Sequence, residues 1–111
     1  MLARQHRLRK QTDITRVLRQ GTRKHSEHLI LRWLPNRVAT SRIVVIVSKK
    51  YDSRAVVRNR ARRRIQEIMR LNWSRIPVGF DILVTVQSDI STLKPEQLKA
   101  EVESLARVIG N

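Results

Sequence analysis

The chain has 111 residues, which suggests a single domain with one modest hydrophobic core. Its 24 lysines and arginines outnumber 9 aspartates and glutamates, and the resulting net charge of +15 indicates a polyanionic partner, with nucleic acid ahead of an anionic membrane surface. The absence of cysteine excludes disulfides and thiolate metal sites, and no apolar run approaches the length of a membrane span.

The first segment, residues 1–10, is predicted to be a basic arm that contacts nucleic acid. It contains Arg4, Arg7, Arg9 and Lys10 and no acidic residue. Because no apolar stretch follows, the arm does not have the form of a secretory signal, and a mitochondrial presequence is the weaker alternative. A chain without cysteine fits a reducing compartment, so we expect a cytoplasmic protein.

A short helix is predicted after the arm. Thr12 is its expected cap, and Ile14, Val17 and Leu18 recur at helical spacing as its buried side. Gly21 then ends the helix.

Three strands are predicted next. Residues 22–26 form a short edge strand, and residues 29–34 alternate, with Leu29, Leu31 and Trp33 on one face and Arg32 on the other. The continuous β-branched run at residues 43–47 is typical of a central strand that is buried on both faces.

The stretch from Ser48 to Arg70 is predicted to contain a helix with one apolar side, capped by Asp52 or Ser53. The apolar side consists of Val57, Ala61, Ile65, Ile68 and Met69. The rest of the helix is rich in arginine, and Glu67 is the only acid within it. Because like charges three or four residues apart repel, and guanidinium groups match phosphate oxygens, this helix is predicted to bind nucleic acid.

The chain then returns to a strand at residues 80–87 and a last helix with Pro95 at its first position. Apolar residues recur through that helix at Leu98, Val102, Leu105 and Ile109. This order predicts an α+β domain, residues 1–111, in which helices pack on one side of a mixed sheet.

The ionisable residues predict no catalytic or metal site. The carboxylates are scattered, and His25 and His28 lie three residues apart with no acidic partner adjoining, which favours a surface pair over a metal site. Charge alone does not separate DNA from RNA. The arginines spread too widely around the helix for a few base-reading positions, which favours phosphate contacts on a folded RNA.

The basic helix and its flanks resemble the signature of the bacterial ribonuclease P protein component. Val47-Ser48-Lys49-Lys50 is followed by Ala55-Val56 and then by Arg58-Asn59-Arg60 with Arg62-Arg63. Arg7-Leu8, Asp13, Val17 and Gly21 match the family's N-terminal helix in order and spacing. The resemblance covers roughly residues 6–87.

The resemblance implies a four-stranded mixed sheet in the order α-β-β-β-α-β-α, with a left-handed β-α-β crossover through the basic helix. In that family the RNA subunit is the catalyst and uses Mg²⁺ to release the mature 5′ end of tRNA. The protein is an accessory subunit, so no catalytic residue, bound cofactor or metal is expected. Its expected partners are the catalytic RNA and precursor tRNA, with neither a membrane nor an obligate protein partner.

The resemblance also assigns two groups of site residues. The catalytic RNA is expected to contact the basic helix and the turn before it, at Lys49, Lys50, Arg58, Asn59, Arg60, Arg62, Arg63 and Arg64. The 5′ leader of precursor tRNA is expected to follow a cleft lined by Arg7, Arg9, Ile14, Leu18 and Arg32. The family has aromatic residues on its first helix where this chain has Ile14 and Leu18, so base stacking in the cleft is expected to be weaker.

Two other classes of function stay open. The first is a ribosomal or general RNA-binding protein without a processing role. The second is a peripheral membrane-binding protein that uses the basic helix, which is the weaker alternative because the apolar side is needed for the core and lacks aromatic anchors.

Overall fold

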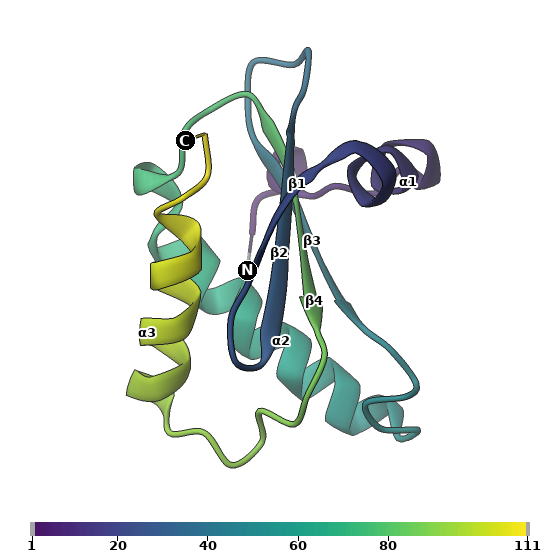
Figure 1. Ribbon diagram of the computed structural model, residues 1–111, viewed down its shortest axis with the longest axis vertical. Coiled ribbons are helices and arrows are strands. Elements are labelled where there is room, and N and C mark those ends of the chain that lie inside the picture. The colour runs from purple at the N-terminus through teal and green to yellow at the C-terminus, as the bar shows by residue number, and fades with distance from the viewer. Residues whose placement is uncertain (1, 111) are drawn as a thin grey trace.

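The computed structural model describes residues 2–110, which form three helices, two short 3-10 turns and one four-stranded sheet (Figure 1). In chain order the elements are η1 (Arg4–His6), α1 (Gln11–Gln20), β1 (Thr22–His25), β2 (Leu29–Pro35), β3 (Arg42–Val47), α2 (Ala55–Leu71), η2 (Trp73–Arg75), β4 (Phe80–Val86) and α3 (Pro95–Ala106). The predicted order α-β-β-β-α-β-α is confirmed.

The sheet is mixed, with strand order β1-β2-β4-β3. Strand β2 pairs antiparallel with β1 and β4, whereas β3 pairs parallel with β4. The connection from β3 to β4 runs through α2, so the parallel β-α-β unit implied by the family resemblance is present.

Strand β3 lies at the edge of the sheet, so the prediction of a central strand at residues 43–47 is wrong. Alternate residues of β3, beginning with Ile43, are buried, and those between them are half-buried. The two central strands are β2 and β4, and in β4 the side chains of Ile82, Leu83 and Val84 are all buried. The apolar run of β3 arises because side chains pack on both faces of this strand. Such packing does not require a hydrogen-bonded strand on both of its edges.

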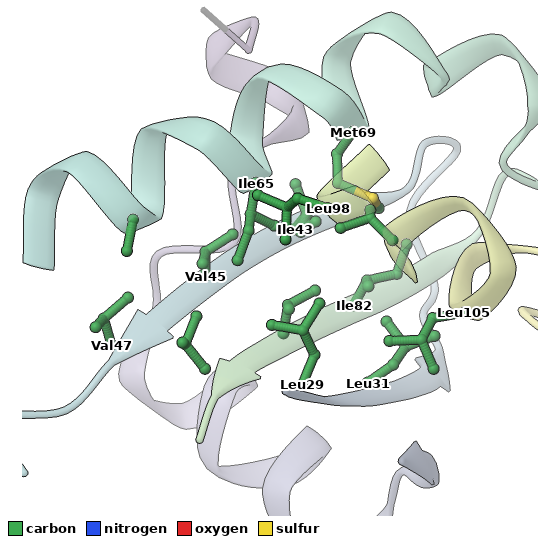
Figure 2. Close-up of a cluster of buried hydrophobic side chains, with 14 of the residues drawn as sticks. Leu29, Leu31, Ile43, Val45, Val47, Ile65, Met69, Ile82, Leu98 and Leu105 are labelled. Carbon is green, nitrogen blue, oxygen red and sulfur yellow. The ribbon is translucent and has the colours of Figure 1, made fainter. Parts of the chain in front are cut away.

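Helices cover both faces of the sheet, so the prediction of helices on one side only is wrong. Helices α2 and α3 lie on one face and α1 on the other (Figure 1). Figure 2 shows the main core between the sheet and α2 and α3, which includes Leu29, Leu31, Ile43, Val45, Ile65, Met69, Ile82, Leu98 and Leu105. Beneath α1 lies a smaller buried cluster of Leu8, Val17 and Leu83.

The N-terminal arm is packed along the open edge of β3. Its Leu2 and Leu8 are buried, and the Leu8 N–H donates to the Ile43 carbonyl at 2.9 Å. The His6 ring lies 4.8 Å from the ring of Trp73, measured between centroids. The arm therefore takes the place that a fifth strand would occupy at this edge and partly shields it.

Both predicted helix caps are wrong by one or two residues. Helix α1 has Lys10 at the capping position, so Thr12 lies inside the helix. Helix α2 has Arg54 there, with no side-chain cap. The carboxylate of Asp52 instead accepts a hydrogen bond from the Arg54 N–H at 2.8 Å, which closes a turn before the helix.

Gly21 ends α1 as predicted, but its φ of −68° shows that no left-handed conformation requires it. A Cβ atom at Gly21 would lie 2.5 Å from the Val17 carbonyl oxygen and 3.2 Å from that of Trp33. We therefore expect Gly21→Ala to lower the free energy of unfolding by about 1–3 kcal/mol, measured by urea denaturation.

Gly79→Ala is the matched control for this steric effect. Gly79 has a φ of +92°, but a Cβ atom there would meet nothing within 4 Å. That variant reports only the cost of a left-handed alanine, about 1–2 kcal/mol. If Gly21→Ala were as stable as the unmodified protein, the close approach of the Val17 and Trp33 carbonyl oxygens could not be the reason for a glycine at this position.

Candidate nucleic-acid interface

The exposed side of α2 carries two arginines that have no partner among residues 2–110. Its buried side, with Ala61, Ile65 and Met69, packs on the core as predicted. Arg60 and Arg63 are exposed on the opposite side, and within residues 2–110 neither forms a hydrogen bond or ion pair. The sequence-predicted residues Lys49, Lys50 and Asn59 are exposed near the start of the same helix. These donors are available to phosphate groups.

Arg58 and Arg62, which were also predicted to contact RNA, bind backbone carbonyls of their own protein. Arg58 donates to the carbonyls of Asp52 at 3.0 Å and Ser53 at 2.8 Å, and so holds the turn before α2. Arg62 donates to the Val45 carbonyl at 3.4 Å and so reaches the edge strand β3. Each guanidinium retains further N–H groups, so contacts with RNA stay a prediction for both.

Arg64 connects α2 to the segment between β4 and α3. Its guanidinium donates to the Ile90 carbonyl at 2.7 Å and to the Leu93 carbonyl at 2.8 Å. Sequence reasoning placed Arg64 with the RNA-contacting residues, because periodicity cannot identify a partner 26 or 29 residues away. The structure gives Arg64 a role in holding this segment, while its contact with RNA stays a prediction.

Removing Arg64 is expected to weaken the fold. Arg64→Ala leaves the carbonyls of Ile90 and Leu93 without their charged donor, so we expect a loss of about 2 kcal/mol in the free energy of unfolding. Thermal denaturation measures the effect. The control is Arg63→Ala, which removes an exposed arginine without a partner in residues 2–110. Equal losses for the two variants would contradict this role for Arg64.

On the other face of the sheet, a buried carboxylate anchors α1. Asp81 on β4 is fully buried and accepts two hydrogen bonds from Arg42, both of 2.8 Å, and one of 2.9 Å from the Asn36 amide. Arg16 of α1 approaches the same carboxylate at 3.4 Å. The hydrogen bond from Asp81 raises the pKa of Arg42, although partial burial opposes it. Asp13 of α1 lies 3.5 Å from both arginines.

Sequence reasoning missed this cluster because it counted Asp81 among scattered acids. The available signal was an aspartate within an otherwise apolar strand, since a buried acid needs a charged or hydrogen-bonding partner. The cluster fixes α1 over β4 and β2, where α1 makes its main contacts with the sheet.

The structure places the predicted leader residues Ile14 and Arg32 on the α1 side of the sheet. Ile14 packs on the small cluster beneath α1, and Arg32 reaches the Thr85 hydroxyl at 3.4 Å. Arg32 also pairs in register with Arg23 on β1, so this face is basic beyond the part that α1 covers. The prediction that Leu18 is buried is wrong, because this residue of α1 is 43% exposed to solvent.

The remaining leader residues, Arg7 and Arg9, lie at the edge of β3, between the two faces of the sheet. Both line a hollow of about 330 Å³ together with Arg62 from α2. Both also line a second hollow, of about 240 Å³, together with Arg42 from β3. Basic residues therefore extend around this edge, from α2 to the side on which α1 lies.

His28 has an acidic partner that the sequence did not reveal. Its Nδ1 atom lies 2.8 Å from a carboxylate oxygen of Glu101 on α3, and the Ser26 hydroxyl donates to the same carboxylate. Burial by itself raises the pKa of Glu101, but the hydrogen bonds from Ser26 and His28 outweigh it and leave this pKa below its usual range. Glu101 lies 73 residues from His28, which explains why the sequence around the two histidines did not reveal this partner.

Neither a metal site nor a membrane span is found in the described part of the chain. Residues 2–110 contain no group of three or more histidine, cysteine, aspartate or glutamate side chains placed to bind a metal. No helix within these residues has the length and apolar character needed to cross a bilayer.

Comparison with known proteins gives one consistent family. The family described as Ribonuclease P matches residues 2–110. The ribonuclease P protein component of Synechococcus elongatus is 38% identical over 110 residues, which cover 94% of this chain and 89% of that protein. The corresponding protein of Pelotomaculum thermopropionicum is 35% identical over 100 residues, covering 90% and 88%.

Solved structures agree with the fold. The RNase P protein from Thermotoga maritima is 27% identical and superposes with a TM-score of 0.83, covering 94% of this chain and 98% of that one. A Staphylococcus aureus RNase P protein is 24% identical, with a TM-score of 0.83 over 93% of this chain and 94% of that one. At that identity the second likeness concerns the fold alone.

Proposed function

Since the chain belongs to the ribonuclease P protein family, we propose that it binds the catalytic RNA of this tRNA-processing ribonucleoprotein through α2 and holds the 5′ leader of precursor tRNA on the α1 side of the sheet. The proposal places the protein in the cytoplasm with its RNA partners. Its role there is to assist the endonucleolytic release of the mature 5′ end of tRNA.

The observation that carries the proposal is the pair of guanidinium groups on α2 that have no partner in the described residues 2–110. Arg60 and Arg63 project from a helix that is fixed to the core through Ala61 and Ile65, so the backbone that carries them loses little freedom when they bind phosphate. Bidentate contacts between arginine and phosphate are strong and depend on geometry.

The leader is proposed to lie against the basic face beside α1. Arg32 offers a guanidinium there, and Arg7 and Arg9 continue the positive surface around the edge of β3. Ile14 and Leu18 supply aliphatic surface, which packs on a base but cannot stack as an aromatic ring does. We therefore expect leader binding to depend more on phosphate than on base identity.

The protein's contribution is electrostatic, and no residue of this chain is assigned a chemical step. Mg²⁺ bound by the RNA subunit supplies the metal chemistry of phosphodiester hydrolysis. The protein neutralises RNA phosphates that would otherwise repel the substrate, and it adds substrate contacts away from the scissile bond. Both effects are greatest when Mg²⁺ is scarce, because the cation also screens phosphate charge.

The test adds the purified protein to its cognate catalytic RNA and precursor tRNA at low Mg²⁺. We expect faster 5′ cleavage of the precursor, followed by gel electrophoresis of the released leader. A precursor with a single-nucleotide leader is the control, and it should gain less from the protein. If the RNA binds the protein but cleavage does not improve, a general RNA-binding protein without a processing role is the better description.

A further inference from the structure

We propose that the groove between α2 and α3 binds one unstacked nucleotide of an RNA, with the base on its apolar surface and the phosphates on Arg60 and Arg63. This inference rests on the proposed function, because it describes how the basic side of α2 holds its RNA. It adds a pocket for a base to a surface so far described only by its charge.

The groove has the volume of a small-ligand site. Its volume is about 770 Å³, within the range of roughly 300–1,000 Å³ that is usual for ligand pockets. Leu98 from α3 is fully buried at its base, and Ile68 from α2 is half-buried. Val56 and Pro95 are exposed where the two helices begin.

Val56 is an apolar residue of the groove that does not contribute to the hydrophobic core. It is 69% exposed, although α2 buries its apolar side through other residues, such as Ala61 and Ile65. A single exposed valine is common on a protein surface. Here it lies beside other apolar side chains in a groove that also contains arginines, so its exposure creates an apolar wall next to cationic groups.

The charges of the groove match a nucleotide. Four basic residues and two acidic residues line it: Arg60, Arg63, Arg64, Lys99, Glu67 and Glu96. Glu67 accepts two hydrogen bonds from Arg70, at 2.5 and 3.1 Å, so part of the acidic charge is already compensated. The groove is therefore more positive than the count of its residues suggests.

The three arginines have different freedom to bind a ligand. Arg64 is held by the carbonyls of Ile90 and Leu93, so it forms a fixed wall. Arg60 and Arg63 lie three residues apart on α2 and have no partner in residues 2–110. Their planar guanidinium groups can stack on a base or pair with phosphate oxygens.

An RNA nucleotide satisfies both halves of the groove at once. The base of the nucleotide has an apolar face that can rest on Val56 and Ile68. The neighbouring phosphates supply the negative charge that Arg60 and Arg63 do not find within residues 2–110. An apolar peptide helix would fill the groove but would leave these guanidinium groups without partners, which costs free energy when they are shielded from water. A base turned out of its stack is the usual target of such sites in RNA-binding proteins.

The first experiment separates base from phosphate. The full chain is titrated with adenosine 5′-monophosphate or with ribose 5-phosphate, and methyl NMR signals are followed. We expect the base-containing probe to shift the methyl signals of Val56, Ile68 and Leu98, and the base-free probe to leave them in place. If both probes shift only signals outside the groove, or the base makes no difference, the inference is overturned.

The second experiment compares two valines of similar exposure. Val56→Ser removes the apolar wall, whereas Val78→Ser changes a residue that is 73% exposed and does not line the groove. We expect Val56→Ser to weaken binding of the catalytic RNA about tenfold, as the loss of one buried valine side chain implies. The salt dependence should be unchanged, because no phosphate contact is removed. Val78→Ser should bind as the unmodified protein does.

The two proposals fail in different ways. If Val56→Ser binds RNA as tightly as Val78→Ser, the groove holds no base, and the inference is wrong even if the protein still improves 5′ cleavage. If sedimentation shows that Val56→Ser alters self-association but not nucleotide binding, a second copy of the chain occupies the groove, which also overturns the inference. Failure of the unmodified protein to improve 5′ cleavage would instead contradict the proposed function.

Discussion

Replacing Asp81 with alanine is expected to lower the free energy of unfolding by about 3–5 kcal/mol, as the loss of one partner from a buried ion pair usually does. The carboxylate is fully buried and receives hydrogen bonds from Arg42, Asn36 and Arg16. Without it, the two guanidinium groups keep only Asp13, at 3.5 Å from each, as an acidic partner, and the buried hydrogen bonds of Arg42 and Asn36 are lost. Urea denaturation followed by circular dichroism measures the loss.

Two further variants identify the cause. Asp81→Asn keeps the size of the side chain and one oxygen acceptor, so it should retain part of the lost stability. Glu67→Gln removes a carboxylate from an exposed pair with Arg70 and should change stability much less. A loss for Asp81→Ala no larger than that for Glu67→Gln would show that the buried cluster does not stabilise the fold.

The variant Arg60→Ala with Arg63→Ala is expected to weaken binding of the catalytic RNA by at least about 100-fold at low salt. Each charge-assisted hydrogen bond to phosphate contributes about 1.5–3 kcal/mol, and two are removed. The slope of the logarithm of the binding constant against the logarithm of the salt concentration should become shallower by about 1.5, because each lost phosphate contact contributes roughly 0.7–0.9 to it. Filter binding across a salt series measures both quantities.

The control for this variant removes the same charge elsewhere. Arg37→Ala with Arg75→Ala deletes two exposed arginines that lie outside α2, so the net charge is equal in the two variants. We expect this control to bind RNA much more tightly than the α2 variant, and both should unfold at the temperature of the unmodified protein. Equal weakening would mean that total charge, and not the surface of α2, determines affinity.

Local periodicity was sufficient to predict the elements and the docking side of the basic helix. Ala61, Ile65 and Met69 were predicted to face the core and are buried there. This succeeds because the period of a helix and the burial of one side are properties of neighbouring residues. The order of the elements followed from the same patterns, and the family resemblance added the β-α-β crossover through the basic helix.

Contacts between distant segments could not be predicted in this way. The position of β3 depends on which strands pair with it, and an apolar run reports only that its faces are covered. The partners of Arg64, Asp81 and Glu101 lie between 26 and 75 residues away along the chain. Two arginines of one helix therefore look alike in sequence, although Arg63 is free within the described residues and Arg64 is bound.

The position of β4 determines when this protein can fold during its synthesis. Strand β4 lies between β2 and β3 but is the last strand to be made, so β2 and β3 have no partner in common until residue 86 has been added. Before that point only the β1–β2 hairpin can pair, and an isolated hairpin is marginal in water. A growing chain that has already exposed the whole of α2 to solvent therefore still lacks its sheet. We therefore expect the surface of α2 to become rigid only after β4 has been added, so that the proposed binding of RNA follows the synthesis of residue 86.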